Sequence, residues 1–195
     1  MANKDAAFGF RPIGKVGQNK DNQGLSEYNI AANSSAIYQN DTVQFLATGY
    51  VGVADTSAAV LLGSLNGVFY TDTADQKPRW ANHLAASNAA TDIVGFVSDD
   101  PYERFEVQAD GTLAIADLGR NTDIVYAAGA SPNFVSKVEI DSNTANVTTA
   151  SKQFRILGVA KDIENSELAN VTTYAANVNV VGIINEHFLK STTGI

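Results

Sequence analysis

The clearest hydrophobic pattern in the chain lies in residues 93–109, IVGFVSDDPYERFEVQA. An apolar run meets the acidic turn 99–101, Asp-Asp-Pro, and apolar and polar residues then alternate strictly. Alternation with a period of two is typical of a strand with one buried and one solvated face. Pro101 cannot donate a ladder hydrogen bond, so it separates two strands. We therefore predict two strands whose register is set by this turn, with Phe105 and Val107 in the core.

Further strands are predicted from short apolar or alternating runs that turn residues bound. They span residues 25–30, 42–47, 51–53, 123–127, 137–140, 154–160 and 178–184. The third is expected to pair with the second. The last two are apolar enough to be central strands that are buried on both faces.

Three local signals add turns and short helices to this pattern. Asn66-Gly67 lies between apolar flanks and predicts a tight hairpin, because both central residues of a type I′ turn need positive φ. Residues 71–92 are predicted to be a long connection between strands that contains a helical turn around residues 80–86. Residues 113–118 are compatible with a strand or with a short helix that Thr112 caps, and we favour the helix.

Together these elements predict a mainly β protein, a β-barrel or β-sandwich body with one or two short helices and an extended N-terminal arm. The body is one domain, residues 25–195, because the chain has the length of a single domain and shows no repeat of fixed period. The arm is residues 1–24, which contain four glycines and show neither strand nor helix periodicity.

The arm differs from the body in charge. It holds four basic residues against two acidic ones, whereas the whole chain carries a net charge of −8. Its apolar anchors are Phe8, Phe10, Pro12 and Ile13. Such a short aromatic cluster either seats in a groove of a partner or folds back on its own body, and the sequence leaves both alternatives open.

Composition narrows the function classes. Hydrophobic residues make up 45% of the chain, which indicates a globular protein, and no apolar run approaches the 18 residues of a membrane span. The acidic net charge argues against nucleic acid as a partner. The absence of cysteine excludes disulfides and thiolate metal sites and is compatible with assembly in a reducing cytoplasm. The first residues lack a continuous apolar segment, so we expect no cleaved secretion signal.

Candidate chemistry is sparse. The chain contains no nucleophile elbow, no P-loop and no dinucleotide-binding glycine pattern. His83 and His187 are far apart in sequence, and no third partner for a metal site or an acid–base pair is evident. Asp99, Asp100 and Glu103 share one turn, which we interpret as a strand connection rather than a calcium site or a glycosidase pair. We therefore predict no catalytic, cofactor-binding or metal-binding residue and no enzyme.

Trp80 is the single tryptophan and follows Arg79. Both residue types are common at interface hot spots, so the pair is a candidate for an exposed sugar-binding or protein contact. A lone tryptophan is also a routine core anchor, and we favour that interpretation.

Four segments resemble small virion structural proteins of tailed bacteriophages, marine ones included. Residues 2–13, ANKDAAFGFRPI, are similar to the family's opening MAN-x-DAPFGLRPV, with Ala7 in place of a proline and Phe10 in place of a leucine. The other three segments are the NGVF hairpin signal, residues 99–111 (DDPYERFEVQADG) and the end of the chain, residues 180–194. The lost proline implies a less rigid arm.

The resemblance implies a head decoration, or cement, protein that is not an enzyme and uses no cofactor. Such proteins lie on the outside of the expanded capsid and bridge subunits of the major capsid protein. The implied partner is therefore the major capsid protein, and neither nucleic acid nor a membrane is one. The implied location is the capsid surface of the virion, after synthesis in the host cytoplasm, and homo-dimers or homo-trimers are expected.

The expected capsid contacts are Phe8, Phe10, Arg11 and Pro12. On this hypothesis the two rings fill apolar grooves and Arg11 pairs with a carboxylate. Two other functions stay open. One is a minor tail or head-fibre protein that contacts the host. The other is a carbohydrate-binding β-sandwich, which needs several exposed aromatic side chains that form a platform.

Overall fold

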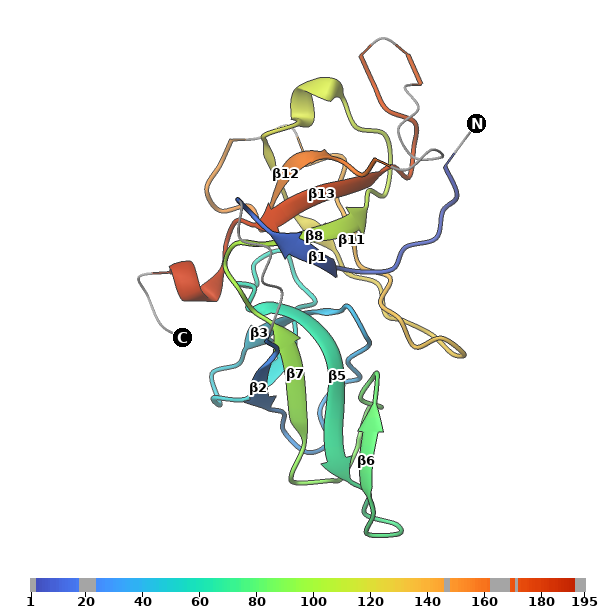
Figure 1. Cartoon of the computed structure of the whole chain (residues 1–195), viewed down its shortest axis with the longest axis vertical. Helices are drawn as coiled ribbons and strands as arrows, with labels where there is room; N and C mark the ends of the chain where they lie inside the picture. The colour runs from blue at the N-terminus through green and yellow to red at the C-terminus, as the bar shows by residue number, and fades with distance from the viewer. Residues whose placement is uncertain (1–2, 18–23, 146–147, 162–168, 171, 192–195) are drawn as a thin grey trace.

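In the part of the chain that the structure describes, two large β-sheets lie one above the other along the long axis (Figure 1). The computed structural model describes residues 3–17, 24–145, 148–161, 169–170 and 172–191. We name the two sheets the upper and the lower sheet, after their places in Figure 1. No helix in this described part of the chain has the length and hydropathy needed to cross a bilayer.

The upper sheet has five strands, each antiparallel to its neighbours. In spatial order they are β1 (Arg11–Lys15), β8 (Glu103–Gln108), β13 (Asn179–Ile184), β12 (Phe154–Val159) and β9 (Asn121–Thr122). A two-stranded ladder, β10 (Ile124–Val125) with β11 (Glu139–Ile140), and the short 3₁₀-helix η1 (Ile115–Asp117) complete this half. β8 thus lies between the first and the last strand of the chain.

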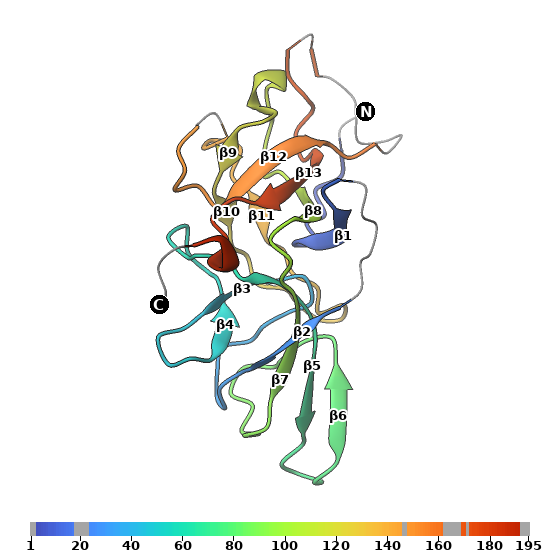
Figure 2. The same cartoon turned by 60° about the vertical axis from the view of Figure 1, so that its left-hand side comes forward.

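The lower sheet is also antiparallel and has β5 at its centre. Its order is β2 (Ser26–Asn29), β7 (Val94–Ser98), β5 (Gly63–Thr71), β3 (Thr42–Phe45) and β4 (Val51–Val53). β5 has nine residues, so one of its edges serves two partners: its start pairs with β3 and its end with β6 (Pro78–Ala81). The β5–β6 hairpin therefore forms the end of the molecule opposite η1 (Figures 1 and 2).

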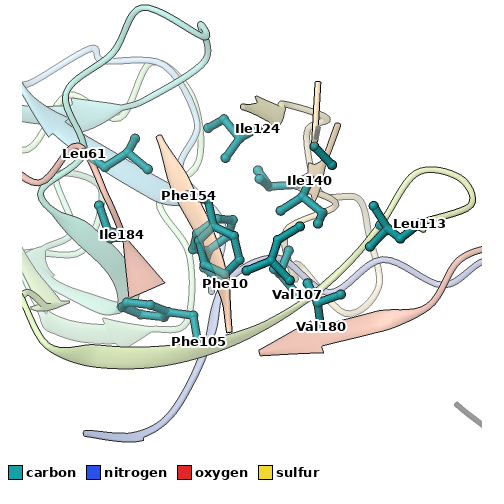
Figure 3. Packing of buried hydrophobic residues seen from close by; sticks show 14 of the residues in the cluster. Phe10, Leu61, Phe105, Val107, Leu113, Ile124, Ile140, Phe154, Val180 and Ile184 are labelled. Carbon is teal, nitrogen blue, oxygen red and sulfur yellow. The ribbon is translucent and has the colours of Figure 1, made fainter. Parts of the chain in front are cut away.

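Each sheet covers a hydrophobic core of its own. In the upper core the fully buried ring of Phe10 lies 5.7 Å from that of Phe105 and 5.1 Å from that of Phe154, between centroids (Figure 3). The lower core includes Leu65 and Val97. Phe105 and Val107 are buried in β8 as the alternation predicted.

The chain crosses between the two cores at the turn from β7 to β8 and again after β13. β7 ends in the lower sheet and β8 begins in the upper sheet, so the turn between them is one link. After β13 the chain returns, and the 3₁₀-helix η2 (Phe188–Lys190) comes to lie beside the lower half (Figure 2). There the ring of Phe188 lies 4.7 Å from that of Phe45. His187 also bridges to Leu61.

The prediction of a mainly β body with one or two short helices is confirmed, with the 3₁₀-helices η1 and η2 as the helices of the described residues. Both sheets stay open rather than closing into a barrel. The prediction that the turn 99–101 sets the register of two strands is wrong. β7 pairs with β2 and β5, whereas β8 pairs with β1 and β13, so each strand takes its register from its own sheet.

Three further local predictions are wrong. Asn66-Gly67 is not a hairpin turn: both residues lie inside β5, where the register against β7 shifts as in a bulge. No helical turn forms around residues 80–86: β6 takes Trp80 and Ala81 into the sheet, and a bend and an isolated bridge at Leu84 follow. β12 is solvated on one face, because Arg155 and Leu157 are exposed. In each case the tertiary surroundings of the segment, and not its local sequence pattern, determine the structure.

The predicted short helix at residues 113–118 exists but is smaller than expected. Only η1, Ile115–Asp117, is helical, and its N-cap is Ala114 rather than Thr112. The Asp117 carboxylate accepts a hydrogen bond from the Ala114 amide at 2.8 Å, which closes the turn.

Candidate functional site

Phe10 belongs to the protein's own core, so its predicted role in a partner's groove is wrong. Its side chain is 0% exposed, its amide donates to the carbonyl of Asn40 at 2.9 Å, and its carbonyl accepts from Oγ of Ser64 at 2.7 Å. Of the two alternatives for the N-terminal segment, folding back on the body therefore holds here. Asn40 and Ser64 come from the lower half, so Phe10 also links the two halves.

Three other predicted contacts lie at the surface of the upper sheet. Arg11 is in β1, and its guanidinium pairs with the carboxylate of Glu106 in β8 at 2.6 Å and lies 4.7 Å above the ring of Phe8. Pro12 lies opposite Phe105 in the same ladder. These side chains hold β1 on β8, and contact of Phe8, Arg11 or Pro12 with a partner stays a prediction.

A cleft of about 580 Å³ lies between β1, the start of β2 and the turn that joins β7 to β8. Asp99, Asp100 and Glu103 line it together with Lys15. The protein's own donors occupy the carboxylates: Lys15 pairs with Asp100 at 2.8 Å, and the amide of Gly14 donates to Glu103 at 3.0 Å.

Asp99 in the same cleft accepts two hydroxyl hydrogen bonds from β2. Oγ of Ser26 donates at 2.9 Å and the hydroxyl of Tyr28 at 2.6 Å. Burial and the neighbouring Asp99 carboxylate raise the pKa of Tyr28 to about 12, so the phenol stays a donor. Within the described residues, no group of three acidic, histidine or cysteine side chains is placed to hold a metal ion.

The two remaining carboxyls of the cleft have pKa values shifted in opposite directions. Burial raises the pKa of Glu103, and the Gly14 amide offsets this only in part. Partial burial also acts on Asp100, but hydrogen bonds from Lys15 and from the Tyr102 amide hold its pKa below the usual value. Opposed shifts are typical of acid–base pairs. Here Gly14 and Lys15 of β1 bind Glu103 and Asp100, and the Tyr102 amide of the turn also donates to Asp100. The two carboxyls therefore hold β1 against the turn.

The two histidines are packed rather than exposed. The ring of His83 stacks on that of Phe134, with centroids 3.9 Å apart and planes 2° apart. His187 is 2% exposed, and its Nδ1 accepts a hydrogen bond from the Leu189 amide at 3.1 Å. Burial and, to a lesser degree, the charge of Lys190 lower the pKa of His187 to about 4. His187 is therefore neutral at pH 7.

Aromatic side chains gather on the outer side of the lower sheet. Val68 and Val97 point into the lower core, so their strand neighbours Phe69 and Phe96 point outward. Trp80 pairs directly with Phe69 across β5 and β6, which places both on one face. We define the aromatic face as Phe69, Trp80, Val94 and Phe96.

Trp80 is 59% exposed and Phe69 39%, so the prediction of Trp80 as a core anchor is wrong. The indole leans across β5 onto Phe96, with centroids 4.6 Å apart and planes at 47°. Gly67 makes this possible, because a Cβ there would lie 3.2 Å from the indole and 3.0 Å from the carbonyl oxygen of Ala81. Gly67, which the sequence predicted in a hairpin turn, thus leaves the space that the indole of Trp80 occupies.

Acidic side chains border the aromatic face. Glu27 in β2 is exposed and lies opposite Phe96 in the ladder. Asp92 accepts a hydrogen bond from the amide of Thr71, two residues along β5 from Phe69, at 3.1 Å. Hydrogen bonds from Thr71 lower the pKa of Asp92, so its carboxylate is charged at pH 7.

The basic side chain nearest in sequence to the aromatic face is already paired. Arg79 binds Asp72 at 2.8 Å and Asp75 at 2.9 Å, both in the turn of the β5–β6 hairpin. These ion pairs close the hairpin. The two side chains placed at the border of the face, Glu27 and Asp92, are both acidic.

Sequence reasoning missed this face because β6 was not predicted. The residues of the aromatic face come from three strands, and only the pairing of β6 with β5 brings Trp80 beside Phe69 and Phe96. The usable signal was the alternation in GVFY and VGFV, which places Phe69 on the side opposite to Val68 and Phe96 on the side opposite to Val97.

The chain matches no protein-family model, no curated protein sequence and no solved structure.

Proposed function

We propose that this chain is a non-enzymatic virion structural protein, a decoration or cement protein that binds the major capsid protein and stabilises its lattice. The partner and the location on the capsid surface come from the resemblance of residues 2–13, 99–111 and 180–194 to small phage virion proteins. The protein would be made in the host cytoplasm and would act after the head expands.

The observation that carries the proposal is the contrast between the cleft and the aromatic face. In the cleft the carboxylates of Asp99, Asp100 and Glu103 have donors from the protein itself. On the aromatic face, by contrast, Trp80 and Phe69 expose large apolar surface to water. Clustered exposed apolar side chains mark an interaction surface in a folded protein. The two cores and the links between them supply a body that suits a clamp.

Binding of this kind stabilises a capsid by mass action, because the protein favours the assembled lattice over free subunits. The test is to add the purified chain to expanded heads that lack it and to measure saturable binding and the temperature at which heads rupture. We expect binding in a fixed ratio to capsid subunits and a higher rupture temperature. Heads that neither bind the chain nor gain stability would refute the proposal.

Electron cryo-microscopy of the intact particle separates this function from that of a minor tail or head-fibre protein. Density repeated over the capsid lattice supports decoration. Density confined to the tail or to the vertices supports the fibre alternative instead.

One observation favours a second candidate, carbohydrate binding. Phe69, Trp80 and Phe96 form a group of aromatic side chains on one sheet face, which is the feature that a carbohydrate-binding β-sandwich needs. The planes of Trp80 and Phe96 meet at 47°, however, so the two rings do not make one flat platform for a pyranose. A glycan array tests this candidate directly, and silence on the array counts against it.

A further inference from the structure

We infer that the aromatic face is the docking surface of this protein and that its partner is a protein surface with an apolar centre and a basic rim. The inference rests on the proposed function, under which that partner is a subunit of the major capsid protein. It moves the docking surface from Phe10 and its neighbours, at and before the start of β1, to the outer face of the lower sheet beside the β5–β6 hairpin (Figure 1).

The apolar centre of this face has the composition of an interface hot spot. Trp80 comes from the edge strand β6, is 59% exposed, and reaches across β5 to contact Phe96, with Phe69 beside it at 39%. Tryptophan is enriched among the few residues that carry most of the binding energy, and such residues cluster at the centre of an interface. The contact with Phe96 fixes the indole before binding, so little side-chain entropy is lost on docking.

The border of the face determines the charge of the partner. Glu27 and Asp92 lie at two places along it, and the Glu27 side chain makes no hydrogen bond or ion pair within the described structure. Arg79 is held by Asp72 and Asp75 and does not offset them. Lysine or arginine side chains opposite Glu27 and Asp92 would complement this border and steer the encounter.

The same border disfavours a second copy of this chain as the occupant. A two-fold dimer through this face would bring the acidic borders of both copies together, on chains that each carry a net charge of −8. A saccharide would meet two rings that are tilted rather than coplanar. A protein partner with apolar side chains shaped to the tilted rings and with a cationic rim matches both the ring geometry and the acidic border.

The experiment measures binding of the full chain to expanded heads that lack it, by co-sedimentation over a range of protein concentrations. Replacing Trp80→Ser is expected to raise the dissociation constant at least about 30-fold, the loss that a hot spot gives. Tyr102→Ser is the matched control, because Tyr102 is 60% exposed but belongs to the β7–β8 turn. It should bind like the wild type.

A charge reversal keeps the test decisive if Trp80→Ser does not fold. Glu27→Lys changes one exposed side chain and is expected to weaken binding about 10-fold in 50 mM salt and less in 500 mM salt, because the lost attraction is screened there. Asp55→Lys, at an exposed position in the segment after β4, is its control for net charge.

The outcomes separate the inference from the proposed function. No binding by the wild type overturns both. Wild-type binding that Trp80→Ser and Glu27→Lys leave unchanged overturns the inference alone, as does a Trp80→Ser variant that loses only glycan binding or only self-association. Selective loss in Trp80→Ser and Glu27→Lys, with both controls intact, supports it.

Discussion

Replacing Phe10 by alanine is expected to lower the free energy of unfolding by about 4 kcal/mol. Its ring is fully buried and contacts Phe105 and Phe154. Burying such a side chain contributes about 1.5–3 kcal/mol, and each aromatic contact adds about 0.5–1.5 kcal/mol. The sum agrees with the cost of about 3–5 kcal/mol that removing a phenylalanine from a well-packed core carries.

Phe8→Ala is the matched control two residues away. Phe8 is half-buried, and its ring contact is the guanidinium of Arg11 at 4.7 Å. Losing a cation–π contact at an exposed site costs about 1 kcal/mol or less. The two variants thus differ several-fold in cost although they remove the same group from the same segment.

Urea unfolding measures this difference. With an m-value of about 2.5 kcal/mol per molar urea, Phe10→Ala should lower the midpoint by about 1.5 M, and Phe8→Ala by less than about 0.5 M. The single tryptophan, Trp80, reports on the lower sheet, while circular dichroism reports on the whole body. Because links such as the Phe45–Phe188 contact join the two cores, both probes should give one transition.

Equal midpoints for Phe10→Ala and the wild type would refute the reasoning. That result would mean that the N-terminal segment does not fill the upper core in solution and keeps the ring of Phe10 for a partner. Two separate transitions would refute the claim that the links make the cores cooperative.

The other predictions concern pH and one glycine. Burial lowers the pKa of His187 to about 4, so stability is full above pH 6.5 and falls as the pH drops towards 4. Asp41, just before β3, is fully buried and accepts a hydrogen bond from the Tyr38 amide at 2.7 Å. Burial raises the pKa of Asp41 to about 6, so its contribution to stability is full below pH 3.8 and is lost as the pH rises through 6. The two trends oppose each other. Urea unfolding between pH 6.5 and pH 4 should show the stability of His187→Gln relative to the wild type improve by about 3 kcal/mol as the pH falls, and that of Asp41→Asn should change in the opposite direction. A stability difference that does not vary with pH would contradict the assignment for that residue. Gly67→Ala should displace the indole of Trp80, shift its fluorescence to longer wavelength and cost about 1–2 kcal/mol, whereas an unchanged spectrum and stability would show that the seat at Gly67 tolerates a methyl group.

The sequence by itself determined the class of the fold and many of its strands. The alternation in residues 103–109 is a local property of the chain, so it correctly predicted β8 and the burial of Phe105 and Val107. The apolar runs likewise located β12 and β13, although not the solvated face of β12. Function was predicted only through resemblance, because no residue pattern carried its own chemistry.

Only the tertiary structure decided which strands pair and which side chains meet. Phe10 lies in a segment without periodicity, and its burial depends on Phe105 and Phe154, which are distant in sequence. Asn66-Gly67 has the residues of a turn, yet hydrogen bonds to β7 and β6 on either side keep β5 extended. The aromatic face exists for the same reason: burial and cross-strand pairing are long-range, so a local pattern can suggest a strand but not its neighbours.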